Sequence, residues 1–233
     1  KSNIKSRYHN VCQLNLYNIL KDVKDNLLNN FIKSEQPRPH HYLCYNHQPK
    51  PHREKVVNFL INHKNGLLSS SHHNLFLDGH KDVENWTTKN RNLYYHSNRT
   101  HYNTTYFSII TESHFSNIDD LNNLSFTEKT WKPITNLQPF ILMADRHQIK
   151  KLKEWGFKTF HPFIDESYDD VLDKDKRQKM IFKQIEILCN KSLEEIHDWY
   201  WSIEKILMHN YYHFYGKWIK SQRDKLLGNL EWK

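Results

Sequence analysis

The sequence predicts an α/β fold built on a doubly wound parallel sheet, followed by a helical, aromatic-rich C-terminal part. β-Prone runs alternate along the chain with segments of helical periodicity. The run YFSIITES (106–113) alternates little between apolar and polar residues, as expected of a strand buried on both faces. We expect an N-terminal helical segment over 1–40, a sheet domain over 41–170 and helices packing on it over 171–233.

The first half of the chain reads as helix, strand, helix and strand. Apolar residues recur at helical spacing over 11–32, and Pro37 lies in the stretch that ends this pattern. HYLCYN (41–46) is a β-prone run, and a helical pattern over 56–61 then stops at an Asn-Gly pair. GLLSSS (66–71) offers a second strand.

The second half continues the alternation. Residues 72–105 are rich in His and Asn and carry no clear pattern. The elements expected after them are a strand over 106–113, a helix in FTEKTWKPIT (126–135), a strand in PFILMA (139–144), a helix through Ile149 to Gly156, a short strand in KTFHPF (158–163) and helices from about Tyr168 onward.

Composition and charge bound the class of protein. A chain of 233 residues with 37% hydrophobic residues is long enough to bury a core. Its formal charge of +8, together with 17 His, favours an anionic partner such as nucleic acid, a phosphate-bearing ligand or an acidic glycan. The 3 Cys lie far apart, which favours a reducing, cytoplasmic location and no disulfide framework. No apolar run predicts membrane insertion.

Charged side chains follow two of the predicted strands. In a doubly wound sheet, ligands bind beyond the carboxyl ends of the strands, where helix N-termini present free N–H groups. Glu128 and Lys129 open one such helix, and the loop HQPKPHR supplies Lys50, His52 and Arg53. A carboxylate can accept hydrogen bonds from ribose hydroxyls, whereas Lys and Arg neutralise phosphate. This pattern predicts a nucleoside-diphosphate site.

Each of these signals also has a plainer interpretation. The TEK sequence at a helix start is often only a cap, with Glu128 favourable near the N-terminus and Lys129 solvated. Arg53 in the first turn of a helix is usually a surface charge. Glu112, at the end of a buried strand, is either a functional carboxylate or a structural hydrogen-bond partner.

The order of these motifs resembles the donor-binding half of α1,3-fucosyltransferases and related GT-B glycosyltransferases. The pieces that carry the resemblance are HYLCYNHQPKPHREKVVNFL, YFSIITESHFSN, SFTEKTWKPI and QPFILMAD. The chain is still more similar to a set of phage, giant-virus and bacterial proteins with TEKTxKPI and GFKTFxxFIDESYD elements, which GFKTFHPFIDESYDD (156–170) matches nearly throughout. The resemblance covers roughly residues 41–190, and its most specific part is the TEK segment.

The resemblance implies a Rossmann-like, nucleotide-sugar-binding domain and a metal-independent hexosyl- or deoxyhexosyltransferase. The residues expected to bind the donor nucleotide are Asn46, Arg53, Thr127, Glu128, Lys129 and Lys132. In this resemblance Arg53 and Lys129 contact the diphosphate and Glu128 holds the ribose. The catalytic candidates are His52 and Glu112, with His47 as a further candidate for the base. The nucleotide sugar is the donor substrate, no cofactor is expected, and the acceptor is a glycan, a protein or modified DNA.

Two departures from the family pattern limit what carries over. Ala144-Asp145-Arg146-His147 replaces a glycine-containing turn, so the sugar is not assumed to be fucose. The family's acceptor domain, which supplies the catalytic base, has no counterpart in the first 40 residues. Either the base lies on another polypeptide segment or the acceptor side is rearranged.

Metal binding and a non-catalytic role are the main alternatives. Asp165-Glu166 could bind a metal, but acids near a helix start usually cap the helix. The His pairs at 40–41 and 72–73 match no metal-ligand spacing, and no DxD-like pair follows a strand, so we predict no metal. The alternative function is a nucleic-acid-binding or accessory protein that uses its basic surface and C-terminal aromatic residues, most of which should be core. The phage-like resemblance places such a protein in the host cytoplasm if it is viral.

Overall fold

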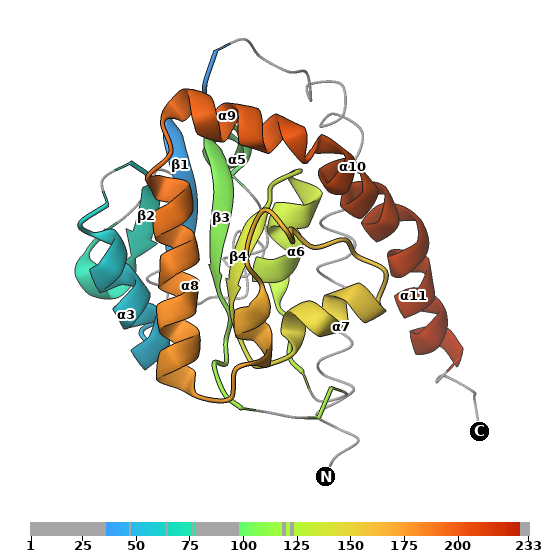
Figure 1. The fold of residues 1–233 in the computed structure, drawn as a ribbon. Helices are drawn as coiled ribbons and strands as arrows, with labels where there is room; N and C mark the ends of the chain where they lie inside the picture. Colours follow the sequence, from blue (N-terminus) through green and yellow to red (C-terminus); the bar gives the residue numbers. More distant parts are fainter. Residues whose placement is uncertain are drawn as a thin grey trace.

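The structure is a computed structural model that describes residues 36–46, 48–63, 65–75, 77, 98–117, 120–121 and 124–228. The helix expected over 11–32 and the candidate base His47 lie outside these residues. The described part of the chain has an α/β fold with a parallel sheet in a Rossmann-like arrangement (Figure 1). This confirms the predicted α/β class with a parallel sheet.

The sheet has 4 strands in the order β2-β1-β3-β4. They are β1 (His40–Asn46), β2 (Leu67–Ser70), β3 (Thr105–Thr111) and β4 (Phe140–Met143). All three pairings are parallel. Every residue of β3 is buried, which explains why its sequence lacks polar alternation. The predicted strands at 41–46, 66–71, 106–113 and 139–144 are confirmed within a few residues.

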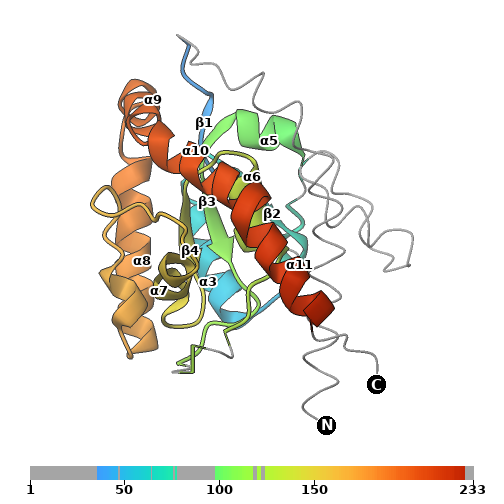
Figure 2. The ribbon, with the colours of Figure 1, turned by 90° about the vertical axis from the view of Figure 1, so that its right-hand side faces the viewer.

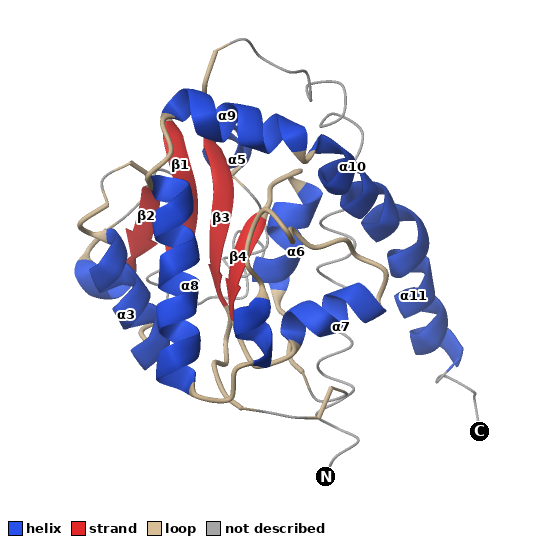
Figure 3. Ribbon diagram, viewed as in Figure 1, coloured by secondary structure: helices blue, strands red, loops and turns tan. Residues whose placement is uncertain are grey.

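Helices follow each strand and surround the sheet (Figure 3). The helices of the sheet region are α3 (Pro51–Leu60), α5 (Arg99–Asn103), α6 (Glu128–Thr135) and α7 (Gln148–Glu154), with the 3₁₀ turns η2 (Ser71–His73) and η4 (Ser167–Asp170). The C-terminal helices are α8 (Lys174–Cys189), α9 (Leu193–Ser202), α10 (Glu204–His213), the π-helical turn η5 (Phe214–Trp218) and α11 (Ile219–Gly228).

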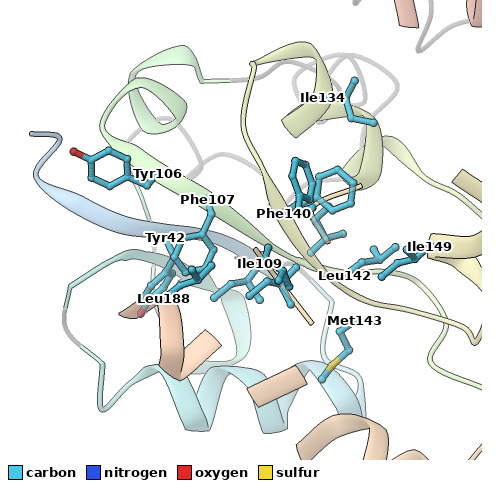
Figure 4. Packing of buried hydrophobic residues seen from close by; sticks show 14 of the residues in the cluster. Tyr42, Tyr106, Phe107, Ile109, Ile134, Phe140, Leu142, Met143, Ile149 and Leu188 are labelled. Atoms are coloured by element: carbon cyan, nitrogen blue, oxygen red, sulfur yellow. The ribbon is translucent and has the colours of Figure 1, made fainter. Parts of the chain in front are cut away.

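The core lies on both faces of the sheet. α8 packs on β1 and β4 from one side, while α5 and α6 contact β3 from the other, as the view in Figure 2 shows. Figure 4 shows Leu188 of α8 beside Tyr42 and, across the strands, Ile134 of α6. The buried apolar residues form one cluster that includes both the sheet and the C-terminal helices. Burial of this shared surface is the main favourable contribution to folding.

The predicted strand in KTFHPF is wrong. Side chains take up the main-chain groups that a neighbouring strand would otherwise bind: Asn210 contacts both the N–H and the C=O of Lys158, and Glu166 accepts from the N–H of Phe160 at 2.7 Å. Pro162 has no N–H for a sheet ladder. The segment is instead a turn that buries Phe160.

The C-terminal aromatic residues are mostly core, as expected. Trp199, Tyr200, Tyr211, Phe214 and Trp218 are buried, whereas Tyr212 is 55% exposed. η5 brings Phe214 and Trp218 onto Trp131 of α6, with ring centroids 5.8 and 4.3 Å away. The C-terminal helices thereby fix the position of α6. Within the described residues, no helix has the length and apolar character needed to cross a membrane.

Candidate functional site

The carboxyl ends of the strands form one edge of the sheet, at the bottom of Figure 1. Asn46 pairs in register with Ser70, and Thr111 pairs with Met143. Thr111 also donates from its hydroxyl to the Asn46 amide oxygen at 2.6 Å, which joins the ends of β1 and β3. The chain runs from β1 outward to β2 and then returns past β1 to β3, so these two strand ends flank the topological switch point, where open α/β sheets bind ligands.

Glu112, the residue after β3, is completely buried and anchors the start of α6. Its Oε1 accepts from the Thr127 N–H at 3.0 Å and the Thr130 hydroxyl at 2.7 Å. Its Oε2 accepts from the Thr127 hydroxyl at 2.6 Å and the Ser113 N–H at 3.1 Å. A carboxylate held in this way has little capacity left for a reacting group. The geometry favours the structural role for Glu112 over the catalytic one.

Three basic side chains at the start of α3 donate hydrogen bonds to the main chain after β3. Arg53 donates from Nη2 to the Glu112 carbonyl oxygen at 3.2 Å, and His52 donates from Nε2 to the same oxygen at 2.9 Å. Lys50 donates to the Ser113 carbonyl oxygen at 2.5 Å. Arg53 is only 4% exposed and also holds the Gln48 carbonyl oxygen at 3.0 Å. The plainer interpretation of Arg53 as a surface charge is therefore wrong.

The charges of this group act on one another. Burial lowers the pKa of Lys50 most, and repulsion by Arg53 and by Lys129 lowers it further. Burial is also the main cause that lowers the pKa of His52 to about 4, with Arg53 and Lys50 adding to the effect. His52 is therefore a neutral imidazole at neutral pH. Because a carbonyl oxygen only accepts, Nε2 carries the proton and Nδ1 carries the lone pair.

The N-terminus of α6 completes the group from the β3–β4 connection. Thr127 is the N-cap, and its hydroxyl accepts from the Lys129 N–H at 3.4 Å. The Lys129 ammonium donates to Glu128 Oε1 at 2.8 Å and to the Thr127 hydroxyl at 3.3 Å. Glu128 is 8% exposed, so this ion pair is largely buried. The cap function weighed for the TEK sequence is thus present, and Lys129 lies against protein rather than in solvent.

Lys132 lies one turn further along α6. It is buried, and this burial lowers its pKa to about 8, while Glu128 raises the pKa and Lys129 lowers it. Lys132 therefore belongs to the same charged group, but it does not lie in the first turn of the helix with Glu128 and Lys129.

A small cleft opens beside Arg53, between the ends of β1 and β2. Its lining includes Asn46, Gln48, Arg53, Ser70 and His72. Its volume of about 10 Å³ is enough for one water molecule but not for a nucleotide. Arg53 thus lines this cleft as well as contacting the Glu112 carbonyl oxygen.

The structure brings most of the predicted site residues to one edge of the sheet. Asn46, His52, Arg53, Glu112, Thr127, Glu128 and Lys129 all lie at the ends of β1 and β3 or at the helix start that follows. Sequence reasoning missed two buried residues behind them, Asp145 after β4 and Arg177 in α8. Asp145 carried a signal, because it directly follows a buried strand. Arg177 carried none, since α8 reads as a charged surface helix.

The acidic residues of FIDESYDD, which include the metal candidates Asp165 and Glu166, have structural partners. Asp165 accepts from the Ser167 N–H at 3.0 Å. Glu166 accepts from the Thr159 hydroxyl at 2.6 Å and pairs with Lys153 at 2.9 Å. Asp169 accepts from the N–H groups of Ile149 and Lys150 at 3.1 and 2.9 Å, which satisfies the start of α7. In the part of the chain that the structure describes, no three His, Cys, Asp or Glu side chains are grouped so as to hold a metal.

Compared with known proteins, the chain matches no protein-family model, no curated protein and no solved structure. The resemblance to GT-B glycosyltransferases therefore depends on the motifs quoted above and on the position of their residues in the fold.

Proposed function

We propose that this protein is a metal-independent glycosyltransferase with a GT-B-like donor domain. It transfers a hexosyl or deoxyhexosyl group from a nucleoside-diphosphate sugar to a hydroxyl of a glycan, a protein or DNA. The proposal is supported by the order of the motifs and by the parallel sheet on which they lie.

One observation carries the proposal: basic side chains from two separate connections meet around Glu112 at the switch point of the sheet. Arg53 of α3 contacts the Glu112 carbonyl oxygen. Lys129 of α6 contacts the Thr127 hydroxyl, which in turn donates to the Glu112 carboxylate. Both Arg53 and Lys129 lower the pKa of Lys50 by repulsion, which is consistent with one positively charged patch formed by the three side chains. Several cations gathered where a parallel sheet binds its ligands favour an anion with more than one charge, such as a diphosphate.

The chemistry needs stabilisation of the leaving group and removal of one proton. The bond between the sugar's anomeric carbon and the diphosphate oxygen breaks, and its electron pair leaves with the nucleoside diphosphate. Arg53, Lys50 and Lys129 stabilise the negative charge that develops there. The acceptor oxygen bonds to the anomeric carbon, and its proton passes to a base. His52 is the catalytic candidate that remains among the described residues, because the Glu112 carboxylate is occupied and the hydrogen bond from Nε2 of His52 leaves a lone pair on its Nδ1.

The ion pair between Glu128 and Lys129 suggests how the donor enters. Both side chains are largely buried, with 15% of the Lys129 side chain and 9% of the Glu128 side chain exposed. In the proposed complex the diphosphate replaces the Glu128 carboxylate at Lys129, and the carboxylate then accepts hydrogen bonds from the ribose. The site exchanges one internal ion pair for two contacts with the donor.

A thermal-shift screen tests the proposal. The panel contains GDP-, UDP- and dTDP-sugars, with a CMP-sugar as the matched control that carries a single phosphate. A ligand that binds the native state raises its stability, so one or more of the diphosphate sugars should raise the melting temperature and the CMP-sugar should not. Release of free nucleoside diphosphate with an acceptor present would then establish transfer. A flat response to all four, with tight and steeply salt-dependent binding to DNA or RNA, would favour the nucleic-acid-binding alternative.

A further inference from the structure

The segment from Glu112 to Ser116 connects β3 to the rest of the candidate site. Its first carbonyl oxygens, those of Glu112 and Ser113, accept hydrogen bonds from His52, Arg53 and Lys50. The positions of these three side chains therefore depend on where this segment lies. A segment without regular secondary structure needs contacts of its own to hold such a position.

The far end of the segment is fixed at Ser116. Asp145, which follows β4, accepts from both the N–H and the hydroxyl of Ser116 through Oδ1, each at 2.6 Å. Arg177 of α8 donates from Nη2 to the Ser116 carbonyl oxygen at 2.8 Å. The hydrogen-bonding groups of Ser116 are thus held by two ionisable side chains from two other elements, and its carbonyl oxygen also accepts from the Arg146 N–H at 3.3 Å.

Asp145 and Arg177 are too deeply buried to reach a ligand. Asp145 is 2% exposed and Arg177 is 1% exposed. Arg177 also donates to the Val171 carbonyl oxygen at 3.1 Å, and its guanidinium lies 4.5 Å from the centroid of the Phe115 ring. The same ring lies 5.7 Å from the His52 ring, so Phe115 links the buried arginine to the site.

The two buried charges compensate each other. Burial lowers the pKa of Arg177. The carboxylates of Asp145 and Asp169 raise it, and Asp145 has the larger effect of the two. Asp145 Oδ2 is buried without a hydrogen-bond partner among the described residues. A buried, incompletely bonded carboxylate is costly to keep, which indicates that its contact with Ser116 has a purpose beyond general stability.

We infer that Asp145 and Arg177 are positioning residues of the proposed diphosphate site: they fix the Glu112–Ser116 segment, and this segment places Lys50, His52 and Arg53. The inference rests on the proposed function, because the effect it names is on binding of the diphosphate. Lys129 is the internal reference for the carbonyl contacts, since its own bonds go to Thr127 and Glu128, and its link to the segment runs through the Glu112 carboxylate rather than through the carbonyls.

The test measures the affinity of the full chain for pyrophosphate and for the nucleoside diphosphate selected by the panel. Asp145→Ala should weaken both at least tenfold. The loss should be smaller in a Lys50→Ala background, because the two changes affect the same contact, and unchanged in a Lys129→Ala background. Leu188→Ala, in the same helix as Arg177, is the control for lost stability and should leave both affinities within about twofold of the wild type. Ser116→Ala removes one of the two bonds to Asp145 and serves as the milder variant if Asp145→Ala does not fold.

The outcomes separate the two ideas. If the wild-type protein binds neither anion, the proposed function is wrong and this inference falls with it. If the wild type binds but Asp145→Ala or Ser116→Ala binds equally well, the positioning role alone is overturned. The positioning role is also overturned if Asp145→Ala loses no more affinity than Leu188→Ala. It is overturned as well if the losses of affinity from Asp145→Ala and Lys50→Ala are fully additive.

Discussion

Arg53 donates a hydrogen bond from its guanidinium to the main-chain oxygen of Glu112 at 3.2 Å, so the helix after β1 is tied to the end of β3. These residues lie 59 positions apart in the sequence. The contact places a buried positive charge at the switch point of the sheet, beside a carboxylate that is fully used in holding α6. Hydrogen bonds from a guanidinium to an anion are stronger than those to neutral acceptors such as these carbonyl oxygens.

Replacement of Arg53 should weaken binding of the diphosphate. A hydrogen bond to a charged group contributes about 1.5–3 kcal/mol, so Arg53→Ala should raise the Kd roughly 10- to 100-fold in calorimetry. Arg53→Lys should restore only part of the loss, because Lys cannot form two parallel bonds to phosphate. Lys55→Ala is the matched control, since Lys55 lies in the same helix but is exposed and paired with Asp175. Equal affinity of the Arg53→Ala and Lys55→Ala proteins would contradict the assigned role.

Replacement of Glu128 should affect the affinity for the nucleoside diphosphate differently from the affinity for pyrophosphate. Glu128→Gln removes the carboxylate that pairs with Lys129 at 2.8 Å. Affinity for pyrophosphate should stay the same or rise, because Lys129 loses a competing anion. Affinity for the nucleoside diphosphate should fall relative to pyrophosphate, because the ribose loses its acceptor. Calorimetry with both ligands gives the ratio, and parallel changes for the two would show that Glu128 does not contact the nucleoside.

Replacement of Glu112 should mainly destabilise the fold. Its carboxylate accepts from Ser113, Thr127 and Thr130, and Glu112→Ala leaves these buried donors without an acceptor. We expect the free energy of unfolding to fall by about 3 kcal/mol in urea denaturation. Glu54→Ala, at the exposed start of α3, should change it by less than about 0.5 kcal/mol. A Glu112→Ala protein with wild-type stability and no transferase activity would instead support the catalytic role.

The neutral state of His52 makes stability depend on pH. Its pKa is about 4 in the folded protein and has an ordinary value of 6.5. Between these values the unfolded chain binds a proton that the folded protein does not, so the free energy of unfolding should fall as the pH is lowered from 6.5 to 4. His52→Gln should show a shallower fall in urea denaturation over this range. An imidazole titration by NMR with a midpoint near 6.5 would refute the assignment. Bound diphosphate should raise the midpoint, because a nearby anion favours the charged imidazole.

The strands of the sheet were predictable because buried strands have a distinctive residue composition. β1, β3 and β4 are apolar runs bounded by turn residues, and parallel strands buried on both faces lack polar alternation. α5 was not predicted, because it is a short helix in a His- and Asn-rich stretch; its N-cap, Asn98, accepts from the Thr100 N–H. KTFHPF has the composition of a strand, but tertiary contacts with Glu166 and Asn210 determine its conformation.

The candidate site was predictable where its residues lie next to strand ends. Parallel strands bring their carboxyl ends to one edge, so Arg53, Glu112 and Lys129 could be grouped before their contacts were known. The contact of Arg177 with Ser116 could not be predicted, because the two residues lie 61 positions apart and no local pattern distinguishes a buried arginine from a solvated one. The saturation of Glu112 also depends on the conformation of the Thr127 cap, which sequence spacing does not determine.

A crystal structure of the full chain with the nucleoside diphosphate that stabilises it most is the most direct test. We expect the diphosphate to lie between the Arg53 guanidinium and the Lys129 ammonium, at the ends of β1 and β3, with a Glu128 oxygen within hydrogen-bond distance of the ribose. A diphosphate bound elsewhere on the molecule, with the Lys129–Glu128 pair intact, would contradict the proposal.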